Sequence, residues 1–592
     1  MKQFLITMAG VFAGLILFFV GVPFLVIASI AGAARPAPPP AETLLTLDLR
    51  ETLADQEPQS PFAFLQGRTL SVVSAVETLH RAERDERVKG LLIRLPEGGI
   101  APGGADELAR AIRAFRAVGK PVIAHSQGIY PSGFSTSAYM LGAASGQFWM
   151  QPASSLQAVG VAKEETFFKR AFDKYGLKAD YEQRYQYKNA VNPLLYDDFT
   201  PAHREAELGY MTAIYGSEID QAAADRKRDP ARLRSVLEAG PYSAEDAAAK
   251  DLIDHVGQEH DAEAALKAQT GGAAKFIELA AYRNAATTPA TGGAAVAVIG
   301  AEGDIVTGAS RGTGFSPSAS AIYSDDVSQA FYDAIADSSV KAIVFRVSSP
   351  GGSDTASEQI LAALNAAKAA GKPVVVSMGT YAASGGYWIS SQASEIVAEP
   401  TTLTGSIGVF GGKFVLGPAL ARFGIDTHGL NVGGDYAAAF GSGEGFTPGQ
   451  RAAFSSWMDH IYDGFVARVA AGRHLPVDRV REIAKGRVWT GAQAKDLGLV
   501  DRIGGFYDAV HEAKRLSGLS PGDHIVLKRF PAKKSPFDAL QNAMGVSAVS
   551  LKTVAAAAWM LGDPRAQGLM EEMMRARAGV QNTTVMAPGG IR

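Results

Sequence analysis

The sequence contains no cysteine and carries almost no net charge. With no cysteine among 592 residues, disulfide bonds, thiol catalysis and cysteine-based metal sites are excluded. This absence suits an oxidising compartment, where a free thiol is a reactive group. The formal net charge of −3 gives no electrostatic reason to expect a nucleic-acid partner. The ten histidines show no H-E-x-x-H or similar ligand spacing, so no metal motif is recognised.

Charge is also missing from the N-terminal stretch Phe4–Ala31, which is almost entirely apolar. At ~1.5 Å per helical residue it is long enough to cross a ~30 Å hydrocarbon core, and residues 1–33 are predicted to form a transmembrane anchor. Lys2 and the amino terminus make the first flank the more positive, which favours an N-inside orientation. A cleaved signal peptide is the alternative, because Ala31-Gly32-Ala33 resembles a cleavage site. The proline-rich residues 34–43 predict a stiff spacer.

The remainder of the chain contains an internal repeat. The pattern G-L-L-I-R-L at 90–95 returns as A-I-V-F-R-V at 342–347, and G-K-P at 119–121 returns at 371–373. Strand patterns alternate with amphipathic helical patterns in both copies, which is typical of an α/β fold with mostly parallel sheets. We therefore predict one α/β domain at 44–284 and a second at 295–522, joined by a linker at 285–294. Residues 523–592 leave the repeat and are expected to form a helical extension.

Ser384 is a candidate nucleophile in the second copy. It lies in Y-A-A-S-G-G-Y-W at 381–388, after an apolar strand pattern and before a helical one. Small neighbours clear space around the hydroxyl, and the glycines leave backbone N–H groups accessible to a developing negative charge. In the first copy Thr136 falls opposite Ser384 at an offset of 248, within a bulkier turn. The alternative is a small-residue turn that only packs a helix against a sheet.

Lys188 is a candidate general base in the first copy. It lies in the tyrosine-rich segment D-Y-E-Q-R-Y-Q-Y-K-N-A-V-N-P at 180–193, opposite Tyr436 of the second copy. A lysine buried among aromatic rings loses hydration, which lowers its pKa, and a neutral amine beside a serine can accept the hydroxyl proton. The alternative is a solvent-facing lysine. The spacing of the two residues does not by itself bring them into contact.

Four motifs together resemble the long form of the signal peptide peptidase A family, which are membrane-bound serine–lysine proteases. They are Y-K-N-A-V-N-P at 187–193, S-S-P-G-G at 348–352, Y-A-A-S-G-G-Y-W-I-S at 381–390 and T-L-T-G-S-I-G-V at 402–409. The resemblance implies tandem crotonase-like domains of repeated β-β-α units, related to the Clp protease subunit. It also implies a homotetramer that is anchored in the cytoplasmic membrane of a bacterium, faces the periplasm and cuts residual signal peptides.

The resemblance also assigns the site residues. It implies that Ser384 is the nucleophile, Lys188 the general base and Ser406 a residue that orients the lysine. The backbone at Gly351 or Gly352 and at Gly385 is expected to form the oxyanion hole. No metal or organic cofactor is expected. Two other functions stay open: an acyl-CoA enzyme of the crotonase type, and a catalytically silent membrane scaffold. Arg94 and Arg346 occupy equivalent repeat positions, which indicates a structural role.

Overall fold

The computed structural model describes residues 38–57, 70–285, 293–310, 321–520 and 522–531, and the backbone of a strand at 584–586. The predicted anchor, most of the linker and most of the C-terminal extension lie outside these residues. Within the described ranges, no helix is long and apolar enough to cross a membrane. The two described pieces of the predicted helical extension both contain a strand.

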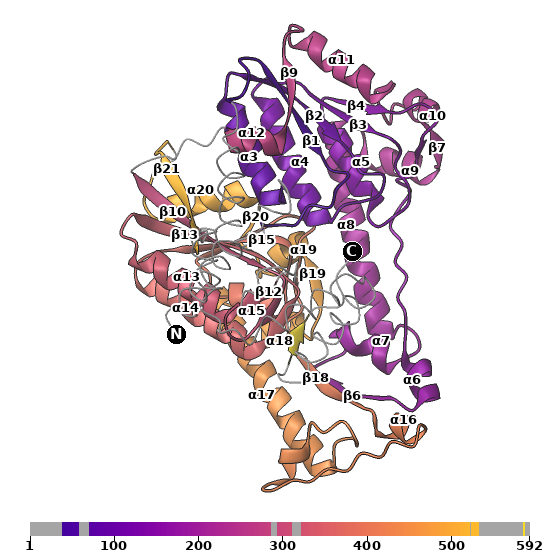
Figure 1. The fold of residues 1–592 in the computed structure, drawn as a ribbon, viewed down its shortest axis with the longest axis vertical. Coiled ribbons are helices and arrows are strands. Elements are labelled where there is room, and N and C mark those ends of the chain that lie inside the picture. Colours follow the sequence, from indigo (N-terminus) through magenta and orange to yellow (C-terminus); the bar gives the residue numbers. More distant parts are fainter. Residues whose placement is uncertain are drawn as a thin grey trace, which may run out of the picture.

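The first half of the chain forms a parallel six-stranded sheet in the order β8-β4-β3-β2-β1-β9 (Figure 1). Its strands are β1 (Thr43–Asp48), β2 (Val88–Arg94), β3 (Val122–Ser126), β4 (Gln147–Met150), β8 (His255–Val256) and β9 (Lys275–Glu278). Side chains alternate along each strand, so Leu45 joins the core under one face while Leu44 packs on the other. The helices that cover the two faces are α3 (Val72–Arg84), α4 (Pro102–Ala117), α5 (Ser135–Ala144), α11 (Glu259–Gln269) and α12 (Leu279–Ala285).

The second half repeats this arrangement in the parallel path β20-β16-β15-β13-β10-β21. The strands are β10 (Ala294–Glu302), β13 (Val340–Ser349), β15 (Val374–Ala383), β16 (Glu395–Ala398), β20 (Arg502–Ile503) and β21 (Ile525–Phe530). β17 (Leu403–Gly405) and β19 (Val488–Thr490) extend the sheet beside β15. The covering helices are α13 (Ser324–Ala336), α14 (Asp354–Ala369), α15 (Gly385–Ser390) and α20 (Phe506–Leu516). The edge strand β21 lies beyond the predicted domain boundary at 522.

Equivalent side chains make equivalent bonds in the two halves. The hydroxyl of Tyr139 donates to the carbonyl of Leu252 at 3.0 Å, and that of Tyr387 donates to the carbonyl of Leu499 at 2.8 Å. The ammonium group of Lys120 binds the carbonyls that end α3, and Lys372 does the same at the end of α13. The repeated motifs thus make the same contacts between equivalent elements of the two halves. The predicted mixed α/β class with parallel sheets is confirmed.

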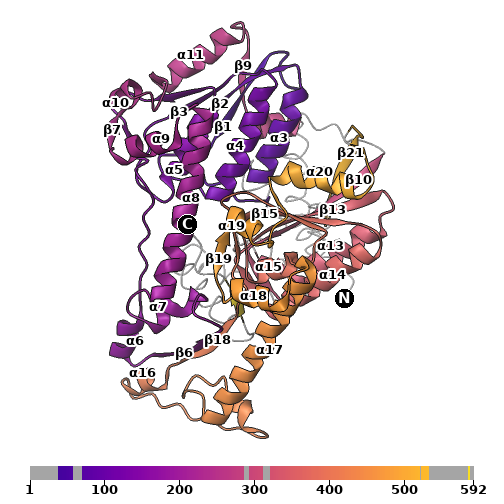
Figure 2. The same ribbon diagram turned by 180° about the vertical axis from the view of Figure 1, so that it is seen from behind.

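A third sheet joins the halves, in the order β12-β11-β14-β22-β18-β6. It consists of β6 (Lys178–Gln183), β11 (Asp304–Val306), β12 (Ala321–Tyr323), β14 (Gly351–Ser353), β18 (Phe410–Val415) and β22 (Thr584–Met586). β6 belongs to the first half, yet it pairs antiparallel with β18 of the second. Helix α8 (Pro201–Asp225) runs from the first sheet down the side of the second half, as both ribbon views show (Figures 1 and 2).

The remaining elements are short helices and strands, apart from one long helix in the second half. Near the sheet of the first half lie β5 (Ser155–Leu156), α9 (Pro230–Glu238), β7 (Tyr242–Ser243) and α10 (Ala244–Ala249). At the other end of α8, beside β6, lie α6 (Lys169–Tyr175), η3 (Asn189–Val191) and α7 (Asn192–Leu195) (Figure 1). The second half adds α16 (Gly417–Ala421), η4 (Asp435–Ala438), α17 (Pro448–Arg473), α18 (Val477–Ile483) and α19 (Gly491–Asp496).

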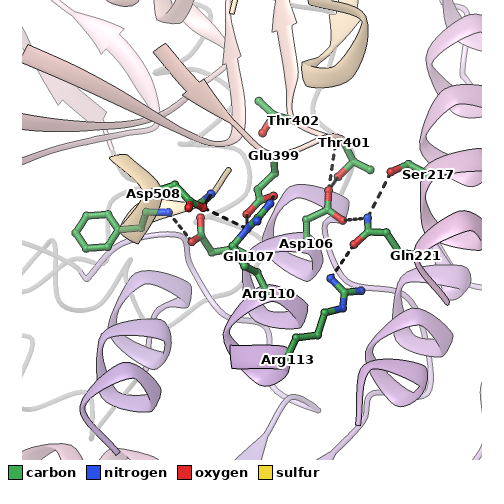
Figure 3. A network of polar contacts seen from close by, with 12 residues as sticks. Asp106, Glu107, Arg110, Arg113, Ser217, Gln221, Glu399, Thr401, Thr402 and Asp508 are labelled. Carbon is green, nitrogen blue, oxygen red and sulfur yellow. Dashed lines mark hydrogen bonds and ion pairs between the residues drawn. The ribbon is translucent and has the colours of Figure 1, made fainter. Parts of the chain in front are cut away.

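Buried charged side chains fill the contact between the two halves. Arg346 of β13 binds both oxygens of Asp55, at 3.0 and 2.6 Å, and Glu107 of α4 at 2.8 Å. Close by, Arg110 holds Glu399 through two bonds, at 3.0 and 2.8 Å (Figure 3). The predicted structural role of Arg346 therefore takes the form of an interface pair between segments far apart in the sequence.

Candidate active site

Ser384 sits at the junction between β15 and α15, with φ of 58° and ψ of −119°. A positive φ is rare for a residue with a Cβ atom, and such strain is concentrated at functional sites. The neighbouring glycines make this sharp turn possible. A Cβ atom at Gly386 would lie 2.6 Å from the carbonyl oxygen of Ser349. The small residues next to Ser384 thus let the turn pack directly against the C-terminal end of β13.

Lys188 reaches this turn from the other half of the chain. It follows β6 and immediately precedes η3, and its side chain is fully buried. The Nζ atom of Lys188 lies 2.6 Å from the Oγ atom of Ser384. The pairing of β6 with β18 explains the contact, because it lays the first-half segment across the second half beside the motif that contains Ser406.

Burial lowers the pKa of Lys188 well below the ordinary lysine value of 10.5. Among the residues that the structure describes, two other groups bond to its Nζ atom: the backbone carbonyl of Ser406, at 3.1 Å, and the Oγ atom of Ser406, at 3.0 Å. Both are uncharged, so neither compensates an ammonium ion as a carboxylate would. A neutral amine has two N–H donors and one lone pair. These match the two oxygens of Ser406 and the hydroxyl proton of Ser384.

Ser406 is held in a strained conformation of its own, with φ of 49°. Its backbone N–H donates to the carbonyl of Arg487 at 2.7 Å, which fixes the residue between β17 and the segment before β19. The structure thus brings Ser384, Lys188 and Ser406 together in one buried cluster. The catalytic roles of these residues stay predictions at this point.

The three predicted oxyanion-hole glycines also lie together. A Cβ atom added at Gly385 would lie 3.0 Å from the backbone nitrogen of Gly352 and 3.2 Å from the Cα atom of Gly351. The N–H of Gly351 already donates to the Oγ atom of Ser349, at 3.1 Å. The backbone nitrogens of Gly352 and Gly385 are therefore the better candidates for holding an oxyanion.

Two further glycines pack against Lys188, and the sequence motifs did not predict them as site residues. A Cβ atom at Gly486, where φ is +78°, would lie 2.6 Å from both the Cβ atom and the nitrogen of Lys188. A Cβ atom at Gly408 would lie 3.2 Å from its Cδ atom. Gly408 stands inside the quoted T-L-T-G-S-I-G-V motif, whereas the only local signal for Gly486 is the tripeptide K-G-R at 485–487.

One group of potential metal ligands lies apart from this cluster. Oxygen and nitrogen atoms of Glu165, His203 and Glu207 come within 4.8 Å of one another. The Nζ atom of Lys163 lies 2.9 Å from Glu165 and 2.8 Å from Glu207. Because this ammonium group already binds both carboxylates, Lys163, Glu165 and Glu207 are better described as an ion-pair network than as a metal site.

Comparisons with known proteins identify the family of the chain. The model of Peptidase family S49 matches the chain twice, at residues 114–272 and 366–520, once in each half. Protease 4 of Salmonella typhi is 34% identical over 465 residues, which cover 76% of this chain and 72% of that protein. Protease 4 of Haemophilus influenzae is 29% identical, covering 86% of this chain and 84% of that protein.

A third relative is the "Serine protease SPPA, chloroplastic" of Arabidopsis thaliana. It is 27% identical over 542 residues, which cover 90% of this chain and 76% of that protein. The two matches to the family model span parts of both halves and include Lys188 and Ser384. The resemblance drawn from the four motifs is thereby confirmed. The chain belongs to peptidase family S49 and is a serine protease.

Proposed function

We propose that this protein is a membrane-anchored endopeptidase that uses a Ser384–Lys188 dyad to degrade residual cleaved signal peptides. The observation that carries the proposal is the 2.6 Å separation of Lys188 Nζ and Ser384 Oγ inside a fully buried cluster. The distance lies within the range expected for a nucleophile and its general base. The lowered pKa of Lys188 supports the same roles, because a base must be unprotonated before it can accept a proton.

The proposed reaction begins when neutral Lys188 takes the hydroxyl proton of Ser384. The Ser384 oxygen attacks a peptide carbonyl carbon, and the backbone N–H groups of Gly352 and Gly385 stabilise the tetrahedral oxyanion. Protonated Lys188 then gives its proton to the departing amine, leaving an acyl-enzyme. A water molecule, deprotonated by Lys188, hydrolyses the ester. Ser406 holds the amine in line throughout, through its carbonyl and hydroxyl oxygens.

The membrane and substrate parts of the proposal derive from the sequence. The apolar stretch Phe4–Ala31 is expected to hold the enzyme in the cytoplasmic membrane, with the catalytic body in the periplasm. Cleaved signal peptides are themselves apolar segments that stay near the membrane, so an anchored protease meets them at high local concentration. We propose further that the enzyme acts as a homo-oligomer, in keeping with the predicted tetramer, and that its fold is of the crotonase type.

The direct test is cleavage of a synthetic signal peptide by purified full-length variants in detergent. Ser384→Ala and Lys188→Met are expected to lower kcat/KM by ~10³ or more, because nucleophile and base act as one unit. Two matched controls are available in the chain. Thr136→Ala removes the hydroxyl opposite Ser384 in the repeat, and Lys413→Met removes another buried lysine, which binds the carbonyl of Gly441.

Both controls should keep near wild-type rates, since neither residue contacts the dyad. Undiminished cleavage by Ser384→Ala would show that the dyad is not the catalytic centre. Cleavage of exposed loops of folded proteins in preference to the signal peptide would instead reject the substrate class.

A further inference from the structure

Arg487 links the two segments that hold the amine of Lys188. It stands in the connection between α18 and β19. The backbone carbonyl of Arg487 accepts the N–H of Ser406 at 2.7 Å, and the carbonyl of Lys485 accepts the N–H of Tyr187 at 3.2 Å. One short turn is therefore bonded both to the residue beside Lys188 and to the residue whose oxygens contact its Nζ atom.

The side chain of Arg487 closes a ring of contacts that includes Tyr187. The Cζ atom of its guanidinium group lies 4.9 Å from the centroid of the Tyr187 ring and 4.6 Å from that of the Trp489 ring. The Nη1 atom of Arg487 donates to Oε1 of Glu205 at 2.7 Å, and the Tyr187 hydroxyl group donates to Oε2 of the same carboxylate at 3.0 Å. A planar guanidinium group can stack on aromatic faces and still donate hydrogen bonds. Tyr187 is thus held both by its ring and by its hydroxyl group.

These contacts cross between the two halves of the chain. Tyr187 and Glu205 belong to the first half, and Arg487 and Trp489 belong to the second. Helix α8, which contains Glu205, runs beside β19, which contains Trp489 (Figures 1 and 2). The cluster of these four side chains therefore joins the halves directly beside Lys188.

We propose that Arg487 is a positioning residue, which holds Lys188 through Tyr187 in line with the nucleophile. The inference rests on the proposed function, because it takes Lys188 as the base. The printed bonds of Nζ go to Ser384 and Ser406, so Arg487 acts on the amine only through its neighbours. Proton transfer needs Nζ within hydrogen-bond reach of Oγ, and a displacement of about 1 Å can slow a reaction ~10²-fold. Loss of Arg487 should therefore lower kcat more than it changes substrate binding.

The variant Arg487→Met removes the charged plane and keeps an unbranched apolar side chain. We expect its kcat for the synthetic signal peptide to fall ~10–100-fold, with KM within about twofold of wild type. Arg487→Lys restores a positive charge beside Glu205 but not the stacked plane, so it should recover part of the rate. An unchanged kcat, or a rise in KM at normal kcat, would overturn the proposal.

A matched cluster in the first half does not include Lys188. The Cζ atom of Arg234 lies 4.8 Å from the centroid of the Tyr215 ring, and its Nη1 atom lies 3.9 Å from Glu238. The Tyr215 hydroxyl group donates to Glu238 at 3.2 Å. Arg234→Met thus removes the same kinds of contact and should keep kcat within about twofold of wild type. Both methionine variants should have similar melting temperatures, because each removes a partly exposed ion pair. Equal losses of kcat in the two variants would contradict a positioning role.

A double-mutant cycle shows whether Arg487 acts through the lysine. In protein that carries Lys188→Met, the further change Arg487→Met should slow the residual cleavage by less than about twofold, because no amine remains to be positioned. The same fold-loss in both backgrounds would overturn the proposal while leaving the dyad intact. Full cleavage by Lys188→Met alone would show that the proposed dyad itself is wrong, and the positioning role would fall with it.

Discussion

At the scale of single residues, the proposed mechanism depends on keeping the amine of Lys188 neutral. Lys188 is surrounded by uncharged groups in a fully buried position, and its contacts match the two donors and one lone pair of a neutral amine. An ammonium ion would instead need three acceptors, and one of them would be the hydroxyl that must be deprotonated. The environment therefore selects the protonation state that a general base requires.

The pH dependence of cleavage reports this protonation state directly. Burial lowers the pKa of Lys188, so the neutral form, which the proposed mechanism requires, persists well below pH 10.5. We expect kcat/KM to rise with pH as Lys188 loses its proton and to fall as the pH drops through the lowered pKa. A profile measured on the synthetic signal peptide checks this expectation. A rise in kcat/KM whose midpoint lies at the ordinary lysine pKa of 10.5 would contradict it.

Ser406 should act on Lys188 and not on substrate binding. Replacing it by alanine removes the hydroxyl bond to Nζ and leaves the carbonyl bond in place. A lost hydrogen bond of ~1–3 kcal/mol corresponds to a fall in kcat of roughly 5–150-fold, with KM little changed. Ser406→Thr is the conservative control and should recover part of the rate. A rise in KM with normal kcat would assign Ser406 to substrate binding instead.

The residues of the dyad could be predicted from the sequence because the two copies differ. Ser384 is flanked by alanines and glycines, whereas the first copy has Thr136 at the equivalent position in a bulkier turn. Lys188 stands where the second copy has Tyr436. Their contact could not be predicted, because no local pattern reports which segments of two domains meet. The role of Gly486 could not be predicted for the same reason. A side chain at this position would clash with Lys188, which is far away in the sequence.

At the scale of elements, the turn before β19 packs directly against Lys188 and fixes its position. Gly486 has φ of +78° and a Cβ atom there would collide with Lys188, whereas Gly371 has φ of +77° and open space around it. Alanine carries the backbone penalty of ~1–2 kcal/mol at both positions, but only Gly486→Ala adds the clash. We expect both variants to lose some thermal stability and Gly486→Ala alone to lose kcat, by roughly tenfold or more. Equal kcat values would show that the turn does not position the lysine.

The elements that the sequence pattern predicted are those with strong periodicity. The parallel strands of both halves and their helices were predicted from apolar runs and from the G-K-P tripeptides that immediately precede β3 and β15. The sheet that crosses between the halves was not predicted. β6 reads K-A-D-Y-E-Q, which has too many charged residues to indicate a strand, and its partner β18 lies in the other copy. Pairing between distant segments is decided by tertiary packing, which a local pattern does not contain.

At the scale of the whole molecule, the proposed mechanism requires the two halves to stay docked, because each supplies one member of the proposed dyad. The Arg346 cluster lies in their contact, with Asp55 and Glu107 as partners. Its repeat equivalent Arg94 is 24% exposed, whereas Arg346 is 1% exposed. Removing one partner of a buried pair leaves an uncompensated charge, whereas a partly exposed pair contributes little.

The matched variants Arg346→Met and Arg94→Met test this view of the interface. We expect Arg346→Met to lower the free energy of unfolding by ~3–5 kcal/mol and Arg94→Met to lower it by about 1 kcal/mol or less. Denaturant titration followed by circular dichroism gives both values, and the loss of cleavage activity should track the loss of docking in Arg346→Met. Similar losses in the two variants would mean that the buried cluster does not hold the halves together.

In the proposed mechanism, Ser384 is a nucleophile that is activated by Lys188 from the other half of the chain. The most direct test is to treat the full-length protein with a fluorophosphonate probe and to locate the adduct by mass spectrometry. We expect a single adduct on Ser384 in the wild type, with labelling at least ~10²-fold slower in Lys188→Met. An adduct on another residue, or labelling of Ser384 at the wild-type rate in Lys188→Met, would contradict it.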